Sequence, residues 1–149
     1  MVLKSLGRVW KKIGVPDFPL VFNQKKIKKV IKKHGITKEE LLDLPVDICN
    51  PYMIFRSKTD SRSFVAVLKN TLSPLIAVVL PLDDDDEARN IIKSFYWKDK
   101  DFIERETKEK RLLYKKSEAT NDDALIAESP ITSDRNIVKK YYLYLFNDV

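Results

Sequence analysis

The sequence predicts an α+β domain in which N-terminal helices pack on an antiparallel sheet of four or five strands, with a C-terminal helix. Apolar residues recur at helical spacing in residues 23–45, whereas residues 48–97 are rich in β-branched and aromatic residues. A second helical stripe ends the chain. Helices followed by a run of strands are typical of α+β architecture. With 149 residues, the chain has the length of a single domain, residues 1–149.

Residues 23–35, NQKKIKKVIKKHG, predict the first helix. Asn23 is placed to cap its N-terminus, and Gly35 suits the left-handed position that ends many helices. The apolar stripe of this helix comprises Ile27, Val30, Ile31 and His34. Because His34, the single histidine of the chain, belongs to this stripe, we expect it to lie along the buried side of the helix.

Residues 37–45, TKEELLDLP, predict a second, short helix. Thr37 and Glu40 have the spacing of a capping box, in which each side chain accepts a hydrogen bond from the backbone N–H of the other residue. Pro45 has no backbone N–H to donate to the preceding turn, so we expect the helix to end there.

Residues 48–56, 63–70 and 74–80 predict two or three antiparallel strands, with a turn over residues 70–74. Residues 82–90, LDDDDEARN, are expected to form a loop or the start of a helix, because adjacent carboxylates cannot be buried together. A further strand is predicted over residues 91–97. Strict alternation would place Ile92, Ser94 and Tyr96 on one face and Ile91, Lys93, Phe95 and Trp97 on the other.

The remaining segments are shorter or more polar. Residues 100–110 predict a short charged helix and residues 112–116 a brief strand, while residues 117–134 predict a loop or irregular hairpin. Residues 135–149 predict the C-terminal helix. Its apolar stripe comprises Ile137, Val138, Tyr141, Tyr142, Leu145 and Phe146, and is suited either to dock on the sheet or to receive a partner.

Charge is concentrated in the N-terminal part of the chain. Residues 1–34 contain ten Lys or Arg and one Asp, a net charge of +9, so the total of +6 leaves −3 for the remainder. This asymmetry indicates a basic face able to attract phosphates, and RNA is the partner we expect. A solvated helix face that keeps the protein soluble explains the charge equally well.

Several classes of protein are disfavoured by the composition. Cys49 is the single cysteine, so neither an internal disulfide nor a cysteine-based metal site is expected. The glycines are scattered rather than grouped in a phosphate-binding loop, and residues 83–86 lack the spacing of an EF-hand. We therefore predict no metal and no cofactor. No membrane segment or signal peptide is recognisable, which favours the bacterial cytoplasm or a phage virion as the location.

Three stretches together resemble a known family. They are KKHGITKEELLDLPVDICNPYMIFRS, then FVAVLKN followed by PLIAVVL, and ARNIIKSFYWKD followed by RLLYKK. The pattern is similar to the C-terminal domain of phage MuF-type proteins, a family grouped with barnase, EndoU, colicin-D-like and RelE-like nucleases. The resemblance covers residues 15–116, a nuclease-like core, and leaves residues 117–149 as an extension. It implies an α+β fold and a metal-independent ribonuclease of phage or toxin type.

The resemblance also implies a set of site residues. Those that match the family's motifs are His34, Ser57, Ser94, Tyr96 and Tyr114. Cleavage of RNA through its 2′-hydroxyl requires a base, an acid and cations that stabilise the phosphorane charge. His34 is suited to proton transfer, with Ser94, Tyr96 and Tyr114 as further catalytic candidates. The residues expected to bind substrate are Lys33, Arg56, Ser57 and Lys98.

Each of these residues also has a structural interpretation. A histidine on an apolar helix face often belongs to the core, and strand tyrosines are commonly buried. A non-catalytic binding or structural module of the same fold, in a phage or toxin system, is therefore the alternative function. That module would act through the basic face or the tyrosine-rich C-terminal helix. Besides RNA, the partners expected of the protein are a cognate immunity protein or a phage structural protein. A role as an immunity protein itself is disfavoured, because inhibitors of RNA-cutting proteins tend to be acidic.

Overall fold

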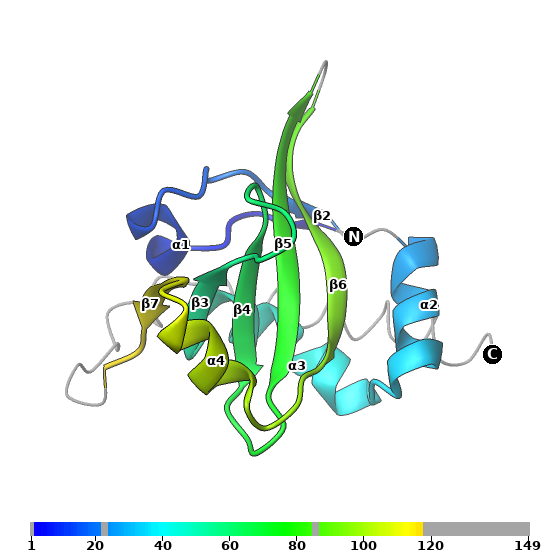
Figure 1. Cartoon of the computed structure of the whole chain (residues 1–149). Coiled ribbons are helices and arrows are strands. Elements are labelled where there is room, and N and C mark those ends of the chain that lie inside the picture. The colour runs from blue at the N-terminus through cyan, green and yellow to red at the C-terminus, as the bar shows by residue number, and fades with distance from the viewer. Residues whose placement is uncertain (1, 22–23, 85–86, 118–149) are drawn as a thin grey trace.

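The protein is described by a computed structural model covering residues 2–21, 24–84 and 87–117. It has the predicted α+β class, with helices on both sides of one sheet (Figure 1). The predicted cap Asn23, the loop over residues 118–134 and the C-terminal helix over residues 135–149 lie outside the described residues.

The described residues form a sheet of seven strands in the order β1-β2-β6-β5-β4-β3-β7. The strands are β1 (Val2–Leu3), β2 (Leu20–Val21), β3 (Met53–Arg56), β4 (Phe64–Lys69), β5 (Leu75–Asp84), β6 (Glu87–Trp97) and β7 (Leu112–Lys115). From β6 to β7, all neighbouring strands are antiparallel. The predicted antiparallel sheet is thus confirmed, and β2 adds a short strand that runs parallel to β6.

Four helices accompany the sheet in the described part of the chain: α1 (Arg8–Lys12), α2 (Gln24–His34), α3 (Lys38–Cys49) and α4 (Phe102–Lys108). The predicted α2 and α4 are confirmed. Gly35 follows α2 with φ +62°, which is the left-handed conformation expected of a residue that ends a helix. The capping box of α3 is also present, with the Glu40 N–H 3.2 Å from Thr37 Oγ1 and the Thr37 N–H 2.7 Å from Glu40 Oε1.

The predicted end of α3 is wrong, because the helix continues through Pro45 to Cys49. Residues 48 and 49, which were expected to begin a strand, belong to this helix. Its buried side includes Leu41, Leu44, Pro45 and Ile48, all packed at helical spacing. Burial of such a stripe outweighs the roughly 3 kcal/mol that an interior proline costs a helix. Proline alone was therefore a poor guide to the boundary.

The acidic segment is also different from its prediction. Residues 82–84 continue β5, and β6 begins at Glu87, so the segment is part of a hairpin rather than a loop or helix start. Figure 1 shows this hairpin extending beyond the rest of the sheet. Asp83 is exposed there. In a protruding hairpin, the backbone groups form hydrogen bonds between the strands while the acidic side chains remain in water. The carboxylates are therefore not buried, and burial was the reason for which a strand was not expected.

The two faces of the sheet carry different cores. We call one the closed face, where Ile54, Ala66 and Ala77 join a cluster with residues of α1, α2 and α3. We call the other the α4 face, where Val65 and Val78 join a smaller cluster with Phe102 of α4 and others. Figure 1 shows α3 behind the sheet and α4 in front of it. Within residues 2–21, 24–84 and 87–117, a single short helix covers the α4 face, so these residues leave part of that face available for a site.

Candidate functional site

A β-bulge in β6 brings consecutive side chains onto the α4 face. On β5, Val78 and Val79 are consecutive, but their partners on β6 are Ser94 and Ile92. Lys93, between these partners, is therefore an extra residue on β6 with no partner on β5. Bulges of this kind redirect side chains and are frequent beside active sites. The predicted strict alternation is therefore wrong: Ile92 shares the closed face with Phe95. Lys93 joins Ser94 and Tyr96 on the opposite side.

These residues line a pocket of about 340 Å³ between α4, β6 and the loop that connects β3 to β4. Its apolar lining consists of Val65, Val78 and Phe102, and its hydroxyl groups come from Ser57, Thr59, Ser94 and Tyr96. Its charged lining consists of Lys58, Lys93, Lys98, Arg105 and Glu106. Four cations against one carboxylate give the pocket a net positive charge, which suits an anionic ligand such as a phosphate group.

Two of the cations are held by carboxylates at the rim. Lys93 Nζ lies 3.2 Å from Asp60 Oδ2, and Arg105 Nη2 lies 3.3 Å from Asp99 Oδ2. The backbone N–H and the guanidinium of Arg62, followed by Lys93, hold the pKa of Asp60 well below its usual range. Asp60 therefore stays ionised and fixes Lys93 at neutral pH.

Lys98 is positioned by aromatic rings. Its Nζ lies 5.0 Å from the centroid of the Tyr96 ring and 5.2 Å from that of the Phe102 ring. Both distances are within the range of cation–π attraction. Phe102 is itself anchored, with its ring centroid 5.8 Å from that of Phe55 in an edge-to-face arrangement. Lys98 is thus a cation with a defined position at the pocket wall.

His34 reaches the edge of this site from α2, which runs beside β6 (Figure 1). Its ring centroid lies 5.2 Å from that of Tyr96, and the two planes are inclined by 31°. The imidazole is half-buried, so it is not sealed within the aliphatic core as the structural interpretation required. It does not line the pocket itself. It contacts the pocket through Tyr96.

Glu106 provides the acidic side chain of the pocket and is 5% exposed. Its carboxylate accepts two hydrogen bonds from Arg111, at 3.1 Å from Nε and 2.7 Å from Nη2. Arg111 also forms an ion pair with Glu109. A paired guanidinium offsets much of the cost of burying the carboxylate.

Besides His34, three predicted residues do not line this pocket. Tyr114 lies on β7, four strands away from β6, or about 19 Å at the usual strand spacing. Its side chain packs against the cluster of the closed face. Arg56 lies over the ring of Phe64, another residue of that cluster, with Cζ 5.1 Å from the ring centroid. Lys33 is exposed on α2 next to His34. The side chains of Tyr114 and Arg56 therefore pack on the side of the closed face rather than in the pocket.

Sequence reasoning missed five polar or charged residues of the lining: Lys58, Thr59, Lys93, Arg105 and Glu106. Arg105 and Glu106 lie in a stretch whose charges resemble an ordinary solvated helix. One signal was available, because Phe102 and Glu106 are four residues apart and so share a helix face. The inward position of Lys93 depends on the bulge, for which the sequence has no clear signature.

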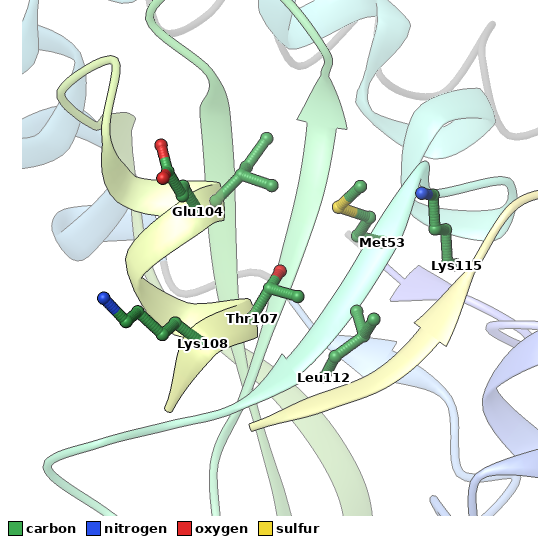
Figure 2. A pocket seen from close by; sticks show the side chains of 7 residues that line it. Met53, Glu104, Thr107, Lys108, Leu112 and Lys115 are labelled. Carbon is green, nitrogen blue, oxygen red and sulfur yellow. The ribbon is translucent and has the colours of Figure 1, made fainter. Parts of the chain in front are cut away.

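A second hollow lies beside α4, on the side of β3 and β7 (Figure 2). Its volume is about 430 Å³. Its lining residues are Met53, Ile103, Glu104, Thr107, Lys108, Leu112 and Lys115. It contains no predicted site residue and only two cations, so the pocket beside β6 is the stronger candidate for binding an anion.

In the described part of the chain, no helix has the length and apolar character needed to cross a membrane. Over residues 2–21, 24–84 and 87–117, no three His, Cys, Asp or Glu side chains gather where they could hold a metal ion.

A family model described as the phage MuF-C-terminal domain matches residues 25–122. The match extends from α2 through β7 and includes His34 and all residues of the pocket beside β6. Comparison with curated proteins and with solved structures finds no match. The predicted resemblance to the MuF-type domain is thus confirmed. The relationship of that domain to nucleases stays a prediction.

Proposed function

Because this chain belongs to the phage MuF-C-terminal domain family, we propose that it is an RNA endonuclease of phage or toxin type that acts without a metal ion. The observation that carries the proposal is the pocket beside β6. It brings Ser57, Ser94, Tyr96 and Lys98 together with further cations and hydroxyl groups. His34 contacts its wall through the ring of Tyr96.

The groups present match the requirements of the reaction. In metal-independent cleavage, the 2′-oxygen of RNA attacks the adjacent phosphorus, and the 5′-oxygen of the next nucleotide leaves with a proton. Positively charged groups stabilise the additional negative charge of the phosphorane. Lys93 and Lys98 are fixed at the pocket wall for this role. His34 supplies an imidazole for proton transfer.

Helix α2 provides a surface for the flanking RNA. Its exposed lysines are Lys25, Lys26, Lys29, Lys32 and Lys33. The helix runs beside β6 and ends at His34, so its charges lead toward the pocket (Figure 1). Contacts between lysines and phosphates are independent of sequence and weaken with salt. The helix is therefore suited to hold the backbone while the pocket holds the phosphate that is cleaved.

The proposal is tested by incubating the purified protein with total RNA, transfer RNA and ribosomes in the presence of a chelator. We expect cleavage products that carry 2′,3′-cyclic phosphate ends, detected by their resistance to ligation until the ring is opened and the phosphate is removed. His34→Ala should lower the cleavage rate by about 10²- to 10⁴-fold while its melting temperature remains near that of the wild type. Lys38→Ala, at an exposed position of the following helix, serves as the control.

Absence of cleavage by the wild type on all three substrates would contradict the proposal. The alternative is a non-catalytic phage module of the same fold that binds through the basic surface. The separation of Tyr114 from the pocket favours this alternative, because one predicted catalytic group is missing from the site. RNA binding without cleavage, unchanged in His34→Ala, would support it.

A further inference from the structure

The buried carboxylate of Glu106 has no role in the chemistry described so far. It belongs to α4, one helical turn after Phe102, and both side chains face the same pocket. Phe102 is packed into the core of the α4 face, which fixes the helix on the sheet. Two hydrogen bonds from Arg111 then fix the orientation of the carboxylate. The result is a rigid acidic group at the wall of a cationic pocket.

Its presence is informative because a carboxylate weakens phosphate binding. A pocket that only retained a phosphate would bind more tightly with a neutral side chain at this position. A buried ion pair is also weak evidence of a stabilising role, since apolar replacements are often neutral or stabilising. Cleavage of RNA, by contrast, requires a group that accepts the proton of the 2′-hydroxyl.

On the basis of the proposed ribonuclease function, we infer that Glu106 is the catalytic base of the site. The 2′-hydroxyl proton passes to the Glu106 carboxylate as the 2′-oxygen forms its bond to phosphorus. The bond between phosphorus and the 5′-oxygen breaks, and the leaving oxygen takes a proton from the His34 imidazolium. The products are a 2′,3′-cyclic phosphate and a free 5′-hydroxyl group.

The positions of the two groups are consistent with these roles. In-line displacement places the attacking and leaving oxygens on opposite sides of phosphorus, so the base and the acid approach from opposite sides. Glu106 lines the pocket from α4. His34 contacts Tyr96, another residue of the lining, from α2. The base and the acid thus come from two different elements that border the same pocket.

The decisive comparison is between Glu106→Gln and Glu109→Gln. Both variants remove a carboxylate that pairs with Arg111, but Glu109 does not line the pocket. We expect Glu106→Gln to lower the cleavage rate by about 10²- to 10⁴-fold and to bind RNA at least as tightly as the wild type. Glu109→Gln should cleave at the rate of the wild type.

Equal rates for Glu106→Gln and the wild type would overturn the inference and leave the ribonuclease proposal intact. Loss of RNA binding together with cleavage would also overturn it, by indicating a structural role. If Glu106→Gln does not fold, Glu106→Asp retains the charge beside Arg111 and shortens the side chain. This variant should lose cleavage at least tenfold and retain binding, and full activity would overturn the inference. A wild type that cleaves no RNA would refute the ribonuclease proposal and this inference with it.

Discussion

The two faces of the central sheet are formed by the same strands but differ in polarity and in how fully helices cover them. On the closed face, α1, α2 and α3 contribute to one continuous apolar cluster, in which Trp10 and Leu44 are each 1% exposed. On the α4 face, a helix of seven residues covers a smaller cluster and leaves a cationic pocket beside it. Side chains on one face of the strands thus stabilise the fold, while side chains on the other face of the same strands form the proposed site. The faces should therefore respond differently to substitution.

The largest expected effect on stability is on the closed face. Leu44→Ala removes a buried side chain between α3 and the sheet, and should lower the free energy of unfolding by about 2–5 kcal/mol. The matched change on the α4 face is Ser94→Ala, at a half-buried position of the pocket. It should change the free energy of unfolding by less than about 1 kcal/mol. Urea denaturation measures both, and equal losses would remove the proposed difference between the faces.

The smallest expected effect is at the rim of the pocket and depends on pH. The pKa of Asp60 is lowered in the folded protein, so the folded state holds fewer protons than the unfolded state in acid. Its contribution to stability is fully present above the ordinary aspartate pKa of about 4 and is lost as the pH falls below it. Asp60→Asn should therefore flatten the decline of melting temperature below about pH 4.

The same substitution should have a second consequence, because Asp60 competes with any phosphate for Lys93. At neutral pH we expect Asp60→Asn to bind RNA about twofold more tightly than the wild type, which corresponds to the loss of one modest ion pair. Asp99→Asn should have a similar effect, because Asp99 pairs with Arg105, another cation of the pocket lining. Weaker RNA binding by Asp60→Asn would show that Asp60 orders the site rather than restrains it.

The sequence predicted the elements that depend on local patterns. Helix α2 ends just before Gly35, and the capping box starts α3. The antiparallel strands form where β-branched residues cluster in the sequence. The errors arose where tertiary packing decides the outcome. Pro45 is tolerated because its helix face is buried, and the acidic hairpin is tolerated because it projects into water. The short N-terminal strands and α1 contain too few residues to produce a periodic signal.

The candidate site was predictable only in part for a related reason. Ser94 and Tyr96 lie on β6, and Lys98 follows directly after it. Because they are close in sequence, all three line the same pocket. Tyr114 is on a strand that the sheet order places at the far edge, which no local pattern indicates. The bulge at Lys93 changed the side to which neighbouring residues point. Sheet order and bulges are properties of the assembled fold.

The most direct test of the account is to locate RNA on the folded protein. We would titrate the isotopically labelled chain with a short RNA that carries 2′-O-methyl groups, which block the attacking oxygen and keep the conformation of RNA. The account predicts amide shift changes at Ser57, Ser94 and Lys98, with none at Leu44 or Ile54 of the closed face. Changes confined to the closed face, or the absence of any change at saturating RNA, would contradict it.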